Sequence, residues 1–333
     1  MLHAYSRDDK YFRGRPDSLS SRRHYYGVRK PDGSLDNTAE ELLANEVENN
    51  GLSVIRKLSD GGQISHRERS DLSVYMAIQF LRTPHMRNNI EQTHASLMDG
   101  VTRSLIKEKN AFTGSLAALR HIDIREAEKL ARESAEAYLK GEIKVVVKPE
   151  LSLLGMFQHC STYAEFMSLC RWEVITVSDD IELITSDCPV HFRSDMHVAL
   201  ADPETIVDFP LTARKMLVMS YAESEERLRK KLRSIIPAKY LAGFVPWHNC
   251  VHYRKAADGD AEGFNRITAS MCHEYIYCGD ATDEFRPVLR APSKNVRFTV
   301  TQHGDDFRLS LEAGKHRRLD RAITLNQKLR VRH

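Results

Sequence analysis

The chain contains 333 residues, of which 41% are hydrophobic and 29% are charged, a composition typical of a globular protein with one large domain or two ordinary ones. No apolar run approaches the ~20 residues that a membrane-spanning helix needs, and the first residues lack the apolar core of a signal peptide. We therefore expect a cytoplasmic protein without a membrane partner. Its six cysteines form no C-x-x-C pair, which predicts reduced and mostly buried thiols.

The first half of the chain is predicted to be mainly helical. Residues 1–37 are rich in Gly, Pro, Ser and charge and should form short strands and turns. Apolar residues then recur at helical spacing over residues 38–58, 65–83, 86–140 and 151–169, which predicts helices there. We expect Asn49-Asn50-Gly51 to interrupt the first of these stretches, and Asn110-Ala111-Phe112-Thr113-Gly114 to form a loop within the third.

The second half is predicted to contain a small sheet. Residues 171–177 alternate as a strand, residues 178–180 turn the chain, and residues 181–184 return as the partner strand of a hairpin. Further strands are expected at residues 205–209, 215–221 and 296–300, and helices at residues 223–236 and 262–278. The predicted fold class is therefore α+β, with a helical N-terminal half packed on a small mixed or antiparallel sheet. We predict a single domain over residues 1–333, with a mainly helical lobe at 38–170, a sheet-containing lobe at 171–310 and a basic tail at 311–333.

The net charge of +3 does not by itself indicate a nucleic-acid partner, but the cations are unevenly distributed. They are dense between Arg227 and Arg233 and again in the tail after Lys315. Such clusters can contact phosphates, although the simpler explanation, which we favour, is a solvated helix face and a frayed tail.

A loop of small polar residues is the most promising place for a site. The apolar run before Thr185-Ser186-Asp187 reads as a buried strand, and Pro189 follows two residues later. We expect this loop to meet residues 79–84 and 208–212 at one site. Within residues 65–83, Tyr75, Gln79 and Arg82 lie at i, i+4 and i+7 and therefore share one face of the predicted helix.

An ordered set of short motifs resembles the bacterial family called domain of unknown function 4238. The motifs are Arg13-Gly14-Arg15-Pro16, His24-Tyr25-Tyr26, Glu41, Glu46-Val47-Glu48, Gln79-x-x-Arg82-Thr83-Pro84, Trp172, Thr185-Ser186-Asp187-x-Pro189-Val190, Phe209-Pro210-Leu211 and Asn265. The likeness covers roughly residues 1–280. Members of that family usually begin with a His-Tyr-Val-Pro-like segment, and we expect this chain to lack it.

The resemblance implies a DNA glycosylase of antiviral defence, which would excise a glucosylated or hydroxymethylated cytosine from double-stranded phage DNA without a cofactor. Two alternatives stay open: a metal-dependent nuclease in antiviral defence, and a non-enzymatic sensor or interaction protein. The sequence contains no G-x-x-x-x-G-K-[ST], G-x-G-x-x-G, H-E-x-x-H or G-x-S-x-G motif, which disfavours P-loop and serine-hydrolase chemistry.

The resemblance also implies roles for particular carboxylates. Base excision passes through an oxocarbenium-like sugar. A carboxylate can either stabilise this charged sugar or activate the attacking water. Asp187 is the first candidate and Glu48 the second, with Thr185 and Ser186 contacting the substrate. The alternative for Asp187 is a residue that only braces a turn.

The other candidates would bind the substrate. Gln79 would contact a base edge and Arg82 a phosphate, unless the two form a buried polar pair. Trp172 or Tyr75 would stack on an extruded base, unless they are core aromatics. Asn265 would hydrogen-bond the base or sugar, or else brace the loop.

One further pattern could bind a metal. In an extended strand, His248, Cys250 and His252 would face one side, as zinc ligands do. A fourth ligand is not evident in the sequence. We therefore predict no metal site.

Overall fold

The computed structural model of the chain describes residues 1–19, 28–29, 32, 34–143, 149–193, 200, 204–221, 250–291, 296–303, 306–313 and 318–319. It divides into two compact units, Met1–Arg87 with Leu153–Asn295, and Asn88–Ser152 with Val296–His333. Helices pack on antiparallel and mixed sheets, so the predicted α+β class is confirmed. The predicted lobe boundary near residue 170 falls inside the first unit, because helices before it pack on strands after it.

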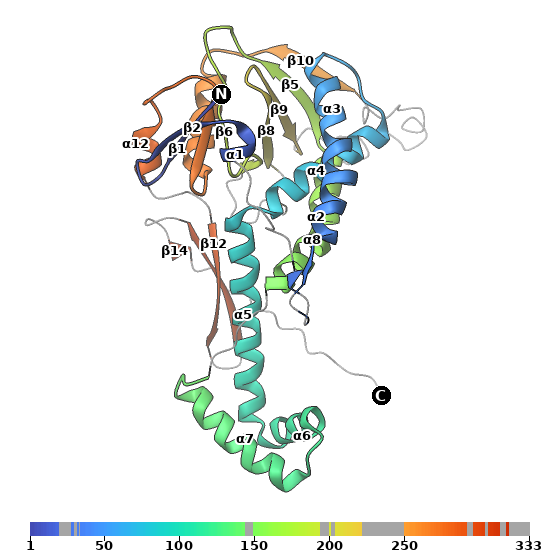
Figure 1. Ribbon diagram of the computed structural model, residues 1–333, viewed down its shortest axis with the longest axis vertical. Helices are drawn as coiled ribbons and strands as arrows, with labels where there is room; N and C mark the ends of the chain where they lie inside the picture. The colour runs from blue at the N-terminus through green and yellow to red at the C-terminus, as the bar shows by residue number, and fades with distance from the viewer. Residues whose placement is uncertain are drawn as a thin grey trace, which may run out of the picture. The chain divides into compact units, whose positions relative to one another are not determined.

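The secondary-structure elements are as follows (Figure 1). The helices are α1 (Pro16–Leu19), α2 (Thr38–Leu42), the π-helix η1 (Leu43–Glu48), α3 (Asn49–Ser59), α4 (His66–Leu81), α5 (Pro84–Lys107), α6 (Lys109–Arg120), α7 (Ile124–Leu139), α8 (Pro149–Leu169), α11 (Asp260–Met271) and α12 (Arg286–Arg290). The strands are β1 (Leu2–Ser6), β2 (Tyr11–Gly14), β3 (Val28–Arg29), β4 (Leu35–Asp36), β5 (Arg171–Thr176), β6 (Thr185–Ser186), β7 (His191–Arg193), β8 (Ile206–Thr212), β9 (Lys215–Ser220), β10 (Val251–Lys255), β11 (Tyr275–Cys278), β12 (Val296–His303), β13 (Asp306–Ala313) and β14 (Arg318–Leu319). Among the described helices, none is long and apolar enough to cross a membrane.

A five-stranded sheet forms the centre of the first unit. Its strand order is β10-β5-β9-β8-β7, and β10 runs parallel to β5 while the other pairs are antiparallel. Successive residues of β5 face opposite sides: Trp172 and Val174 join a large apolar cluster with α3, α4 and α8, whereas Ile175 joins a smaller cluster with α11. Helices therefore cover both faces of this sheet.

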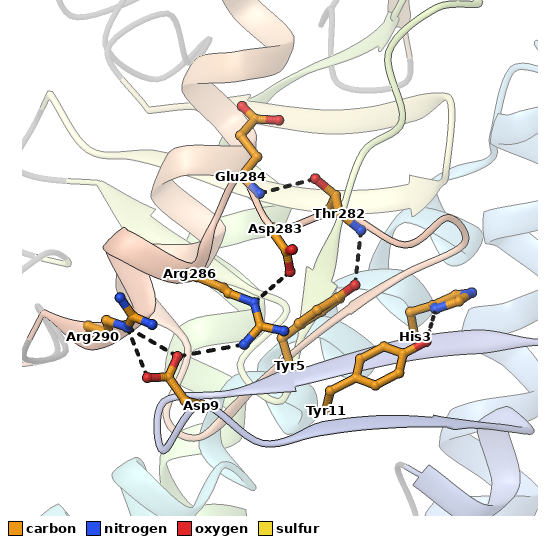
Figure 2. A network of polar contacts seen from close by, with 9 residues as sticks. All are labelled: His3, Tyr5, Asp9, Tyr11, Thr282, Asp283, Glu284, Arg286 and Arg290. Atoms are coloured by element: carbon orange, nitrogen blue, oxygen red, sulfur yellow. Dashed lines mark hydrogen bonds and ion pairs between the residues drawn. The ribbon is translucent and has the colours of Figure 1, made fainter.

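A second sheet, of order β2-β1-β11-β6, joins the start of the chain to residues far along it. Arg7 follows β1 and donates hydrogen bonds to carbonyls around the ends of α11 and α12, among them those of Cys272 and Leu289. Figure 2 shows the exposed side of the same junction, where Asp9 pairs with Arg290 and lies near Arg286 of α12. The N-terminal residues are thus an integral part of the first unit.

The strands of the second half differ from the predicted hairpin. Residues 177–184 form no strand, and β5 pairs instead with β9, which begins 39 residues after β5 ends. The strand β6 consists of Thr185 and Ser186 alone, and it pairs with β11 in the β2-β1-β11-β6 sheet. The hairpin prediction was wrong because a short polar turn between apolar runs does not reveal a more distant partner.

The predicted helix over residues 262–278 also ends early. The helix α11 stops at Met271, and Tyr275 to Cys278 form β11. In a strand, Tyr275 and Tyr277 face one side and Ile276 and Cys278 the other. That alternation was the signal for a strand, and the apolar content of the run obscured it.

Two predicted interruptions of helices are absent. Asn110 to Gly114 lie within α6, and the break comes instead at Glu108. Asn49-Asn50-Gly51 continue from η1 into α3. Gly51 has a packing role: a Cβ atom there would come within 2.5 Å of the Tyr75 ring, so glycine allows α3 and α4 to approach closely.

The second unit contains most of α5, together with α6, α7 and the β12-β13-β14 sheet. The hydroxyl of Tyr138 in α7 donates to Asp99 of α5, and Arg103 of α5 lies over the Tyr138 ring. The predicted basic helix at residues 223–236 lies outside the described residues, as does most of the basic tail, of which residues 311–313 and β14 are described.

Candidate functional site

The three segments expected to meet do come together in the first unit. The Thr83 side chain, after α4, hydrogen-bonds to the thiol of Cys188 in the Thr185–Val190 loop. Tyr75 of α4 packs edge-on against Phe209 of β8, with ring centroids 6.2 Å apart. Val190 and Phe209 also belong to the same apolar cluster. The meeting place is therefore partly a hydrophobic core.

Asp187 uses its carboxylate to hold the backbone between α11 and β11. One carboxylate oxygen accepts the N–H of His273 at 2.8 Å, and the other accepts those of Glu274 at 2.7 Å and Tyr275 at 3.1 Å. Burial raises the pKa of the Asp187 carboxyl, while these three hydrogen bonds and the charge of His273 oppose the rise. This is the geometry of the bracing alternative, and a catalytic role of Asp187 stays a prediction.

The neighbours of Asp187 are also engaged with the backbone. The Ser186 hydroxyl donates to the Cys188 carbonyl at 2.9 Å and accepts from the Cys188 N–H at 3.1 Å, which closes a local turn. Thr185 pairs with Tyr277 in the second sheet. Asn265 bridges the strand entry, donating to the Glu182 carbonyl at 2.8 Å and accepting from the Ile184 N–H at 2.9 Å. These contacts agree with the alternative role of Asn265, in which its side chain braces the loop.

Trp172 is a core residue in this structure. Its side chain has 0% exposure, its indole N–H donates to the Met167 carbonyl at 2.8 Å, and the guanidinium of Arg69 lies 4.4 Å from its ring centroid. A base could stack on this ring only after α4 moved, so the geometry agrees with the core alternative.

Four of the predicted residues form one cluster beside α4. Arg82 donates to the Glu48 carboxylate at 2.8 Å, and the two side chains are 30% and 37% exposed. Both charges act on the Tyr75 hydroxyl, to which the Gln79 side chain donates a hydrogen bond. Burial raises the pKa of Tyr75, and the Arg82 charge opposes that rise. We call Glu48, Tyr75, Gln79 and Arg82 the Glu48 cluster.

The local structure explains how Glu48 reaches Arg82. Glu48 is the last residue of η1, and Leu43 at its start is buried in the core. Short π-helices are often found at functional sites because their widened turn displaces side chains from the regular helical path. The 3.6-residue periodicity used for sequence reasoning does not predict such a turn, so the Glu48–Arg82 pair could not be predicted from spacing.

A second, more deeply buried group of titratable side chains, His191, Arg193 and Asp208, was not predicted from the sequence as a cluster. His191 has 0% exposure and Asp208, its direct partner across β7 and β8, has 2%. Arg193 donates to Asp208 at 3.0 Å. Burial lowers the pKa of His191 to about 4 and raises that of Asp208, which the Arg193 charge opposes. An aspartate inside the apolar run Ile206-Val207-Asp208-Phe209 was the available signal.

The metal pattern is described only in part. His248 lies outside the described residues, while Cys250 is exposed and His252 half-buried. Within the described ranges, the structure contains no group of three or more His, Cys, Asp or Glu side chains placed to hold a metal ion.

The fold and the site together define an α+β protein with a part-exposed Glu–Arg ion pair at the end of a π-helix. The chain belongs to the family described as protein of unknown function DUF4238, whose model matches residues 2–282. The resemblance stated from the short motifs is thereby confirmed at the level of the family. Neither the comparison with curated proteins nor that with solved structures found a match.

Proposed function

We propose that the protein is a DNA glycosylase of antiviral defence, acting in the cytoplasm on double-stranded phage DNA that carries glucosylated or hydroxymethylated cytosine. The Glu48 cluster carries this proposal, because it combines a part-exposed carboxylate, a cation, a phenol and an amide. Family membership supports it through the resemblance described above.

Within this proposal, Glu48 is the catalytic carboxylate in place of Asp187. The Asp187 oxygens already accept three backbone N–H groups, whereas the Glu48 carboxylate pairs with Arg82 and reaches solvent. A carboxylate that meets a reacting sugar needs both access and a free lone pair. Glu48 satisfies these requirements better.

The proposed reaction breaks the bond between the sugar C1′ and the base nitrogen, and the bonding electrons leave with the base. Glu48 stabilises the resulting oxocarbenium-like sugar and accepts a proton from the attacking water. Arg82 provides a positive charge for a flanking phosphate. Tyr75, whose hydroxyl is held by Gln79, lines the place of the extruded base.

Mass spectrometry of small products tests the reaction. The purified protein, incubated with hydroxymethylated or glucosylated phage DNA, should release the modified base and leave abasic sites, whereas unmodified DNA should be unaffected. Glu48→Gln should lower the single-turnover rate by about 10²- to 10⁴-fold. Glu46→Gln, an exposed carboxylate of the same π-helix, is the matched control and should retain full activity.

The outcomes separate the alternatives. Full activity of Glu48→Gln would show that Glu48 is not the catalytic group. Strand breaks that disappear with a chelator, without prior base loss, would favour the nuclease. DNA that is bound but never altered would favour the sensor, and either result would refute the glycosylase.

A further inference from the structure

The strand β2 and the residue after it expose aromatic and cationic side chains together. Tyr11 and Phe12 are 45% and 41% exposed, and Arg13 and Arg15 are exposed as well. β2 is the outer strand of its sheet, and β1 is its neighbour among the described strands. We call residues Tyr11–Arg15 the β2 edge.

The two aromatic rings of the β2 edge lie on opposite faces of the sheet, because successive residues of a strand alternate. The Tyr11 hydroxyl is hydrogen-bonded to Nδ1 of His3 at 2.7 Å (Figure 2). Arg13 lies directly across from His3 and therefore on the same face as Tyr11. Phe12 lies on the other face, edge-on to Tyr275, with ring centroids 6.2 Å apart. Both rings are thus held by a neighbour and still reach solvent.

The backbone of the Arg13-Gly14-Arg15-Pro16 motif is fixed, although its arginine side chains are exposed. The Arg15 carbonyl accepts the N–H groups of Ser18 and Leu19 at 3.0 and 3.2 Å and the Ser18 hydroxyl at 2.8 Å. Glycine at position 14 allows α1 to approach β2, since a Cβ atom there would lie 3.0 Å from the Ser18 hydroxyl oxygen. A backbone that is ordered in advance lowers the entropy lost when a ligand binds.

The cations of the β2 edge are available to a ligand. In the described part of the chain, no ion pair joins Arg13 or Arg15 to a carboxylate. The acidic side chains of the adjoining turn are already paired, Asp8 with Lys10 at 3.8 Å and Asp9 with Arg290 at 2.9 Å (Figure 2). The β2 edge therefore presents a positive charge that is complementary to phosphates.

We propose that the β2 edge binds single-stranded DNA, with Arg13 and Arg15 on phosphates and Phe12 stacked on an unpaired base. Cations combined with exposed aromatic rings are the means by which proteins bind single strands without sequence preference. A peptide strand added to the open edge would use the backbone of β2 and would not need the arginines. The choice of DNA over RNA rests on the proposed function, whereas the phosphate and stacking contacts do not.

Fluorescence anisotropy of the full chain with labelled oligothymidylate tests the surface. The double variant Arg13→Gln, Arg15→Gln should bind about tenfold or more weakly, and the slope of log affinity against log salt should fall by about 1.4 because two phosphate contacts are lost. Phe12→Ala should weaken binding by about 5- to 100-fold and leave the salt slope unchanged. Arg125→Gln of α7 and Phe157→Ala of α8 alter an exposed arginine and an exposed phenylalanine elsewhere and should bind normally.

Oligothymidylate contains no cytosine, so its binding and the proposed release of a modified base can fail independently. Absence of binding by the unaltered protein would overturn the proposal, as would full affinity of the Phe12→Ala variant or of the double arginine variant, with the fold verified by circular dichroism. Displacement of the DNA by polyglutamate at equal concentration would show that any polyanion suffices and would also overturn it. Binding of oligouridylate about tenfold more tightly than oligothymidylate would overturn the choice of DNA.

Discussion

Replacement of Asp187 by alanine should destabilise the protein strongly without touching the proposed catalytic group. The substitution removes the acceptor of three backbone N–H groups, those of His273, Glu274 and Tyr275. Each of these part-buried donors, once left without a partner, costs roughly 1–3 kcal/mol. The substitution also removes a carboxyl whose pKa is raised by burial. Relief of the unfavourable burial of that group offsets part of the loss in stability. We expect a net loss of about 3–5 kcal/mol in the free energy of unfolding.

Urea denaturation followed by circular dichroism measures this loss. Asp179→Ala, which removes an exposed aspartate from the preceding turn, is the control and should change stability by less than about 0.5 kcal/mol. At a temperature where the Asp187→Ala variant is still folded, it should release the modified base at close to the normal rate. A loss below about 1 kcal/mol would refute the bracing role. A folded Asp187→Ala variant without activity would indicate that Asp187 takes part in the reaction.

Two other predictions concern burial and packing. The pKa of His191 is about 4 in the folded protein against 6.5 when exposed, so the unfolded state binds more protons between these values. The free energy of unfolding should therefore fall by up to about 3 kcal/mol as the pH drops from 6.5 to about 4. Urea titrations at a series of pH values should show a smaller fall for the His191→Gln variant. Equal falls for the two proteins would contradict the assignment of this effect to His191. Gly51→Ala should lower the free energy of unfolding by about 1–3 kcal/mol, because its Cβ would overlap the Tyr75 ring. Gly114→Ala, with open space around its Cβ, should raise it by up to about 1 kcal/mol, as thermal unfolding would measure. An unchanged stability of Gly51→Ala would show that α3 and α4 can separate freely.

Local signals in the sequence predicted the elements that local interactions determine. Ser65 and Glu68 form a reciprocal capping box at the start of α4, and Pro84 marks its end, so this helix was predicted nearly to the residue. The strands β8 and β9 were also predicted, since one turn connects them. Such elements depend on residues only a few positions apart.

The missed features depend on distant partners. β5 pairs with β9 and β10, and β6 pairs with β11, and none of these contacts has a signature in the local pattern. The candidate site follows the same rule. Glu48 and Arg82 were both named from the sequence, but their ion pair requires a π-helix and a helix–helix contact that hydrophobic periodicity does not encode.

The position of β1 has a consequence for the synthesis of the protein. The β1–β2 hairpin can form as soon as residues 1–14 leave the ribosome. The other edge of β1 pairs with residues 275–278, so it has no partner until that segment has been synthesised. Contacts of such long sequence separation slow folding, and an unpaired strand edge is open to association with other chains. We therefore expect the newly made first unit to complete its fold only after translation has passed residue 278.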